Sequence, residues 1–167
     1  CGSGVTPYTV HQYGVDYIRI TCPGEHTLSF QGALNTSLLS VSPFSGEFAF
    51  WSNKGDESDT TLTRQFDFSD VDSPLTLSYM TWYDIEEDYD YVYLEYSLDG
   101  ERWEIMRTPS GTDEDPSGNS FGWGYNAFSG GDGSWIEEEV DLSDFAGEEI
   151  WLRYEYVTDA AVNGEGL

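Results

Sequence analysis

Apolar and polar side chains alternate along most of this chain, and a period of two residues is typical of β-strands that bury one face. Residues 90–98 show the pattern most clearly, with an apolar side chain at every second position from Val92 to Leu98. Asp99-Gly100 follows directly and favours a hairpin back into residues 102–107, because its tight turn requires positive φ. The same alternation predicts further strands at 27–30, 47–52, 60–68, 75–79, 135–142 and 150–156.

No stretch keeps a 3.6-residue apolar period over three turns, so we expect an all-β fold. Eight or nine antiparallel strands separated by turns are typical of a β-sandwich, either a jelly roll or a fold like a carbohydrate-binding module. We assign the sandwich to residues 27–167 and an extended arm to residues 1–26. The long segment at 108–133 is expected to be a functional loop or a packed flap.

The charge of the chain narrows the choice of partner. It has 6 basic and 32 acidic residues, a net charge of −26, yet 16% of its residues are aromatic. Disordered acidic chains are poor in aromatic residues, so we expect a folded domain with a large aromatic core. Nucleic acid and anionic membranes require a basic surface and are excluded as partners. The acidity fits cation binding, a saline habitat, or both.

The densest acidic segment is residues 84–90, with five carboxylates in seven residues between two predicted strands. Carboxylates held this close repel one another and take up protons unless a cation neutralises them. Calcium is the natural cation, because it accepts six to eight hard oxygen ligands from irregular loops. The spacing is not that of an EF-hand loop, and the alternative is a solvated acidic turn in a protein that is acidic throughout.

Other acidic segments are weaker candidates. Residues 56–59 and 113–115 are shorter clusters, whereas the acidic residues of 137–141 alternate between strand faces and cannot converge on one ion. Glu138 falls on the apolar face of that strand, so we expect it to need a partner such as Arg64 or Arg153.

Two cysteines are too few for a disulfide scaffold. Cys1 could bridge to Cys22, could carry a lipid as the first residue of a mature bacterial lipoprotein, or could do neither. No apolar run approaches the length of about 18 residues that a membrane-spanning helix needs, so no transmembrane segment is expected.

Catalysis finds little support in the sequence. His11 and His26 are isolated, and neither belongs to a zinc-binding H-E-x-x-H pair or a nucleophile elbow. Acidic pairs capable of cleaving a glycoside abound, but nothing selects one of them. Trp51, Tyr93 and Trp151 could stack on sugar rings, although core packing is the preferred role for most aromatic residues here. We therefore predict that the chain is not an enzyme.

An ordered set of motifs resembles a known family. They lie at 50–56, 59–64, 82–91, 118–122, 140–143 and 156–164, and a leading segment lies at 13–18. Together they resemble the C-terminal, MAM-like jelly-roll region of the immune inhibitor A family of secreted bacterial metallopeptidases, over about residues 13–167.

The resemblance implies an extracellular or cell-surface bacterial β-sandwich that is associated with calcium. It does not imply peptidase activity, because the zinc site of that family lies in a separate upstream domain. The residues that it implies as calcium ligands are Asp84, Glu86, Asp88, Asp90 and Asp159.

One departure from the family pattern concerns assembly. Family members continue beyond the motif at 156–164 with a further apolar strand, whereas this sequence stops at Leu167. A jelly roll without its last strand exposes unpaired backbone groups, which another strand can cover. Residues 5–20 have strand character and could fill that groove in the same chain or in the next subunit, which would give a filament.

Two functional hypotheses follow. The first is a non-catalytic, calcium-binding module with a binding, adhesion or structural role outside the cell, whose partner is an extracellular protein or glycan. The second is a self-associating subunit of an extracellular filament or tube, joined by strand donation. A carbohydrate-active or peptidase-associated fragment is a third and weaker interpretation.

Overall fold

The computed structural model describes residues 4–10, 14–35 and 37–167. Cys1 and His11 lie outside the described residues, so the expectations that concern them stay predictions. The chain divides into two units, Cys1–Ser37 and Leu38–Leu167. The described residues of the first unit form no regular strand or helix, and their apolar side chains are exposed.

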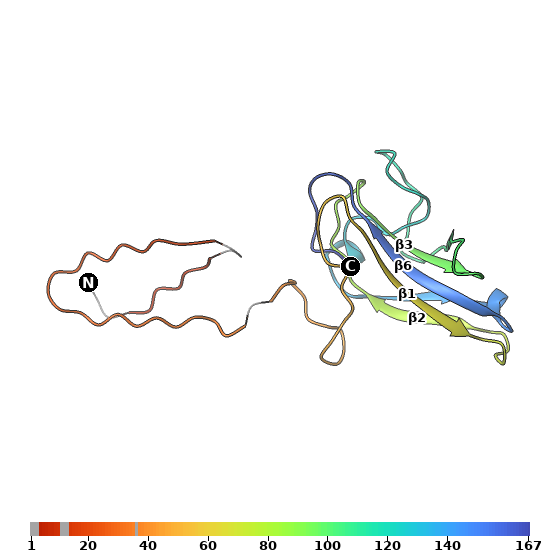
Figure 1. Ribbon diagram of the computed structural model, residues 1–167, viewed down its shortest axis with the longest axis horizontal. Helices are drawn as coiled ribbons and strands as arrows, with labels where there is room; N and C mark the ends of the chain where they lie inside the picture. Colours follow the sequence, from red (N-terminus) through yellow and green to blue (C-terminus); the bar gives the residue numbers. More distant parts are fainter. Residues whose placement is uncertain (1–3, 11–13, 36) are drawn as a thin grey trace. The chain divides into compact units, whose positions relative to one another are not determined.

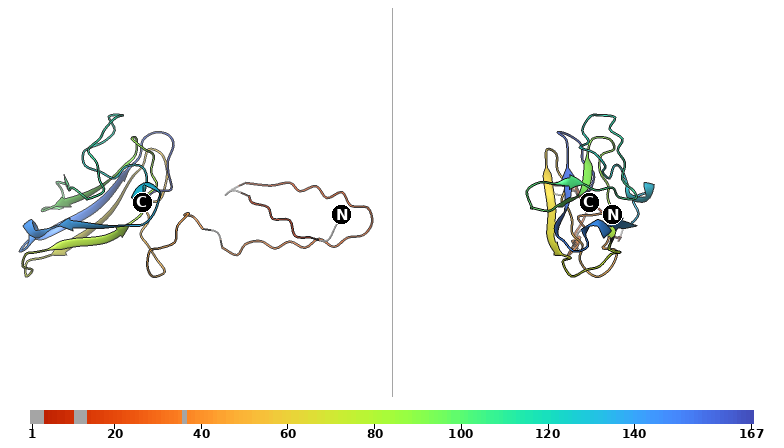
Figure 2. Two further views of the ribbon diagram at one scale, coloured as in Figure 1. Left: turned by 180° about the vertical axis from the view of Figure 1, so that it is seen from behind. Right: turned by 90° about the vertical axis from the view of Figure 1, so that its right-hand side faces the viewer.

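The second unit is built from two antiparallel sheets (Figure 1). The larger sheet has the order β1-β6-β3-β4, with β1 at Asp59–Asp67, β6 at Glu149–Val157, β3 at Tyr91–Ser97 and β4 at Glu104–Ile105. The smaller sheet pairs β2, Thr76–Thr81, with β5, Ile136–Asp141. Figure 2 shows the two layers from behind and from the side.

These elements confirm the predicted all-β class with antiparallel pairing. Short 3₁₀ turns occur at Ser129–Gly131 and Ser143–Phe145, and the described residues include no α-helix. Within the described part of the chain, no helix has the length and apolar character that crossing a bilayer would require.

Alternating side chains place the core between the sheets. On β5, Glu138 and Val140 are buried while Glu137, Glu139 and Asp141 are exposed, as the period of two requires. One apolar cluster centres on Leu94, Ile150 and Leu152 of the large sheet, with Val140 and Leu142 of the opposite layer. A second cluster, nearer the loops, contains Tyr83, Ile85, Val92, Tyr125 and Tyr156.

Strand β3 is buried on both faces, because the long loop after β4 covers its outer face. Tyr93 is fully buried there; its hydroxyl accepts the Phe121 N–H at 2.8 Å, and the two rings stack at 5.6 Å. Val92 also exchanges two backbone hydrogen bonds with Tyr125 of that loop. The suggestion that Tyr93 could stack on a sugar is therefore wrong, and the loop is a packed flap.

The hairpin predicted at Asp99-Gly100 forms, but with a longer turn and a shorter return strand than expected. Gly100 has φ +74°, and the Asp99 carboxylate accepts the N–H groups of Glu101 and Arg102, both at 2.8 Å. These hydrogen bonds hold residues 99–102 in a wide turn. The return strand therefore begins later than predicted, and β4 contains only Glu104–Ile105.

The expected ion pair of Glu138 is also wrong. Arg153 lies directly opposite Glu95 in the β6–β3 register and pairs with it at 2.5 Å, and with Glu155 at 3.1 Å. The Arg64 guanidinium lies over the Phe66 ring instead. Glu138 is fully buried and accepts the Ser110 N–H at 3.4 Å.

Two expected strands are not formed among the described residues. Residues 27–30 lie in the first unit, outside any sheet. Residues 47–52 belong to the second unit but pair with no strand, and Phe48 and Phe50 remain 87% and 82% exposed. Alternation marks a segment that can form a strand, but a strand also needs an edge to pair with.

The burial of β3 predicts which substitutions destabilise the fold. Leu94 is 1% exposed at the centre of the larger apolar cluster, so Leu94→Ala should lower the free energy of unfolding by about 2–5 kcal/mol. Urea denaturation followed by tryptophan fluorescence measures the change. Leu98→Ala, at a position 64% exposed beside the β3–β4 turn, is the matched control and should change stability by less than about 0.5 kcal/mol. Equal losses in the two variants would contradict this core.

Candidate metal centre

The register of the large sheet brings three loops together at one end. Tyr91, the first residue of β3, pairs with Val157, the last residue of β6, and Val157 also pairs with Asp59 at the start of β1. The residue before β3 and the residues after β6 must therefore be neighbours. These positions hold Asp90 and Asp159, which are 69 residues apart in sequence.

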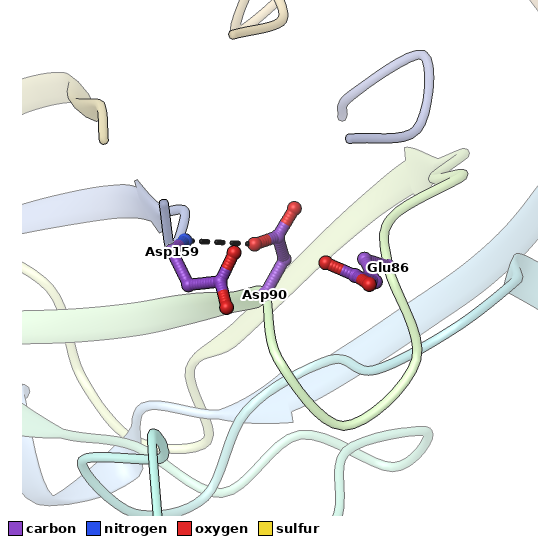
Figure 3. A group of neighbouring side chains, drawn as sticks. All are labelled: Glu86, Asp90 and Asp159. Atoms are coloured by element: carbon purple, nitrogen blue, oxygen red, sulfur yellow. Dashed lines mark hydrogen bonds between the residues drawn. The ribbon is translucent and has the colours of Figure 1, made fainter. Parts of the chain in front are cut away.

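Three carboxylates meet at this end. Glu86, Asp90 and Asp159 each offer one oxygen, and these oxygens lie within 4.8 Å of one another (Figure 3). The Asp159 N–H donates to Asp90 Oδ1 at 3.0 Å, and the Tyr156 hydroxyl donates to Asp90 Oδ2 at 3.2 Å. Asp90 is thus fixed in orientation, with Asp159 on one side of it and Glu86 on the other.

The environment disfavours the charged form of two of these groups. Burial raises the pKa of Asp90, and its hydrogen bonds from Asp159 and Tyr156 only partly oppose that rise. Burial also raises the pKa of Glu86, and the nearby charges of Asp159, Asp90 and Asp56 raise it further. A group of like charges with raised pKa values is one that a bound cation would relieve.

One oxygen in the group is buried without a partner. Glu86 Oε2 has no solvent contact and accepts no hydrogen bond from any described residue. A buried carboxylate oxygen that lacks a donor is costly, and a metal ion is one way to satisfy it. Together with the convergence of three carboxylates, this oxygen indicates that the site could hold a metal ion.

A fourth carboxylate stands beside the group. Asp56 raises the pKa of Glu86 through repulsion, and its Oδ1 accepts the Asn163 side-chain N–H at 2.7 Å. Its loop is held against the end of β6, because the Ser58 N–H donates to the Thr158 hydroxyl at 2.9 Å. In the sequence, residues 56–59 form a separate acidic cluster, and the signal that links them to this site is the strand predicted directly after them at 60–68.

The structure brings together Glu86, Asp90 and Asp159 of the five predicted ligands, and it places the other two elsewhere. Asp88 adopts φ +69°, and its carboxylate accepts the Asn126 side-chain N–H at 2.9 Å. Asp84 exchanges backbone hydrogen bonds with Gly166, and its pKa is raised by burial and by Glu165. As metal ligands, all five residues stay predictions.

The fold and this cluster define a class of protein: an antiparallel β-domain whose loops gather carboxylates at one end. A family model described as the MAM domain of immune inhibitor A-like proteins matches residues 28–167. The chain belongs to this family, as its motifs implied, and a MAM domain is a β-sandwich.

Two relatives cover most of the chain. The pre-pro-metalloprotease PrtV of Vibrio cholerae is 32% identical over 127 residues, which are 76% of this chain and 13% of PrtV. Immune inhibitor A of Bacillus thuringiensis subsp. alesti is 31% identical over 128 residues, 74% of this chain and 17% of that protein. Bacillopeptidase F of Bacillus subtilis is 27% identical over 93 residues, covering 55% of this chain and 5% of its own length. The chain therefore spans less than a fifth of these relatives and corresponds to one domain of them.

The raised pKa values predict how stability depends on pH without a metal ion. Glu86 and Asp90 bind protons more tightly in the folded state than in the unfolded state. Their contribution to the free energy of unfolding is therefore largest at a pH below their usual pKa values of 4.5 and 3.8. This contribution is lost as the pH rises through the raised pKa values of the folded state. With a chelator present, the free energy of unfolding should therefore fall as the pH increases from about 4. Urea titration at each pH measures it. The fall should be smaller in Glu86→Gln, and an identical pH profile in that variant would contradict the electrostatic picture.

Proposed function

We propose that the chain is a non-catalytic, calcium-binding β-sandwich module of an extracellular bacterial protein, with the ion held by Glu86, Asp90 and Asp159. The observation that carries the proposal is Glu86 Oε2, which is buried without a donor and lies beside two other carboxylates. What favours an ion over a solvated acidic turn is that this unpartnered oxygen belongs to a group of three converging carboxylates.

The chemistry of the donors favours calcium. All three side chains offer hard carboxylate oxygens, which suit calcium and magnesium rather than the softer metals that prefer imidazole or thiolate. The three carboxylates come from two irregular loops, and calcium tolerates the flexible geometry that such loops present. Magnesium demands a near-ideal octahedron and keeps several waters, so it is the weaker candidate.

An ion at this position would lock one end of the sandwich. Glu86 lies in the loop between β2 and β3, Asp90 directly precedes β3, and Asp159 follows β6. The same ion would offset the repulsion that raises the pKa values of Glu86 and Asp90. Calcium in this proposal stabilises the module and fixes its loops, and no chemical step is assigned to it.

The biological role is that of an accessory domain. The family relationship and the metalloprotease relatives support a part in a secreted protein, in which this domain serves binding, adhesion or structure. We further propose that the domain has jelly-roll topology and that residues 1–26 form an extended arm. Its proposed partner is an extracellular protein or glycan. Lipid attachment at Cys1 would place the same module at the cell surface.

A second role, as a self-assembling subunit of a filament or tube, is favoured by one observation. Both β1 and β2 end their sheets, and an apolar groove lies beside them. Free strand edges next to an apolar groove are the acceptor that strand donation requires.

Calcium should stabilise the protein by mass action, because the ion binds only the folded state. At a free calcium concentration 100 times the Kd, the gain is about 2.7 kcal/mol, which corresponds to a rise in Tm of about 5–10 °C. Differential scanning calorimetry with calcium and with EGTA measures the difference. Asp159→Asn should abolish most of this shift, since it removes the charge of one ligand.

The matched control is Asp88→Asn, an isosteric change in the same acidic loop. Asp88 bonds to Asn126 rather than to the three-carboxylate group, so its variant should keep the full calcium response. A Tm that calcium leaves unchanged in the unmodified protein would refute the metal proposal. A response lost in Asp88→Asn and kept in Asp159→Asn would move the site elsewhere in the loop.

A further inference from the structure

The turn at residues 86–90, which carries two of the proposed calcium ligands, has a second set of partners. Glu86 and Asp90 stand at the two ends of this turn, and the Asp90 N–H donates to the Glu86 carbonyl at 3.2 Å. The chain between them loops away from the three carboxylates (Figure 3). The tip of the turn, Asp88 and Tyr89, is bound by the flap, residues 108–128, which covers the outer face of β3.

A reciprocal pair of hydrogen bonds joins the tip of the turn to the flap. The Asp88 N–H donates to Asn126 Oδ1 at 2.8 Å, and the Asn126 side-chain N–H donates back to Asp88 Oδ1 at 2.9 Å. Asp88 and Ala127, the residue after Asn126, have positive φ values of +69° and +61°. Residues that carry a Cβ rarely adopt this conformation unless surrounding contacts hold it. The pair therefore helps to fix the backbone of the turn and of the flap together.

Two further hydrogen bonds join the tip to the middle of the flap. The Asp88 carbonyl accepts the Ser117 hydroxyl, and the Tyr89 carbonyl accepts the Asn119 side-chain N–H at 3.3 Å. Both donors lie shortly before Phe121, the flap residue that stacks on the outer face of β3. The tip is therefore bound both by the end of the flap and by its middle.

Of the three carboxylates, Glu86 depends most on the flap for its position. Asp90 directly precedes β3 and Asp159 follows β6, so the pairing of these two strands holds both. Glu86 instead lies between two attachments to the flap. On one side, the Ile85 N–H donates to the Ala127 carbonyl at 3.0 Å, and on the other side lies the bound tip of the turn.

Charge acts on the same turn from the opposite side. Without a cation, the negative charges of Asp159, Asp90 and Asp56 repel Glu86. A bound cation would reverse the sign of this force and draw Glu86 toward Asp90 and Asp159. Because the turn is short and is closed by a hydrogen bond between its ends, a displacement of Glu86 also moves its tip. The ion and the flap therefore act on the same five residues.

From these contacts we infer that the flap and the calcium site are coupled, and that Asn126 is the positioning residue that couples them. Calcium bound at the three carboxylates orders the flap, and an ordered flap raises the affinity of the site for calcium, because coupling between two sites is reciprocal. The inference rests on the calcium site proposed above and adds its regulation. Phe121, which is 67% exposed on the flap, belongs to a surface whose order then depends on calcium.

Hydrogen–deuterium exchange of the full chain, in calcium and in EGTA, tests the inference. Suitable probes are Thr112 and Gly124 of the flap, whose N–H groups donate to each other's carbonyls at 2.8 and 2.9 Å. Calcium should slow their exchange at least about fivefold. The turn at residues 99–102 is the internal reference, because it lies at the opposite end of β3 and is held by the Asp99 carboxylate. Its exchange should be the same in calcium and in EGTA.

Substitutions at the reciprocal pair test the role of Asn126. Asn126→Ala removes both hydrogen bonds, so calcium should no longer slow exchange in the flap, and the Kd for calcium should rise at least about fivefold in isothermal titration calorimetry. The matched control is the double variant Asp88→Asn with Asn126→Asp, which exchanges the two side chains. It keeps the net charge and rebuilds the pair with donor and acceptor reversed, so it should retain both the Kd and the slowed exchange. A loss of stability alone changes neither measurement.

The outcomes separate this inference from the proposed calcium site. Flap exchange that calcium leaves unchanged, in a protein whose Tm rises with calcium, would overturn the coupling and leave the calcium site standing. An unchanged Kd in Asn126→Ala, or a double variant that behaves like Asn126→Ala, would overturn the role of Asn126. A Tm that calcium does not change in the unmodified protein would overturn the calcium site and the coupling together.

Discussion

The antiparallel pairing of β3 with β6 is the constraint on which the rest of the structure depends. It joins the two centremost strands of the large sheet, places Glu95 opposite Arg153, and aligns the start of β3 with the end of β6. Shifting β3 by one residue against β6 would turn Leu94 out of the core. It would also separate Asp90 from Asp159, so the same pairing that builds the core builds the candidate metal centre.

The acidity of the chain is distributed in two physically different ways. Exposed carboxylates such as Glu137 and Glu139 lie on the solvent face of a strand, where water screens them and where they discourage pairing between sheets. Glu86, Asp90 and Asp159 are instead held together by backbone geometry at a loop junction. Only in the second arrangement would a cation relieve the repulsion, because burial removes the water that would otherwise solvate the charges.

The agreement between sequence and structure is close where alternation is supported by a neighbouring strand. Strands β1, β2, β3, β5 and β6 lie within two residues of the predicted bounds. The wrong predictions share a cause, which is that each depends on a distant part of the chain. The surroundings of Tyr93 and Glu138 come from the flap after β4. Residues 27–30 and 47–52 have the pattern of strands but no described partner strand.

What the sequence determined by itself was the class of fold, the strand periodicity and the existence of an acidic loop at residues 84–90. These depend on local patterns, because period, turn residues and charge density can be read within a few positions. The tertiary structure decided which carboxylates converge. Asp88 turns toward Asn126, while Asp159 arrives from 69 residues away through the β3–β6 register. Proximity of that kind is set by strand pairing, which no single segment encodes.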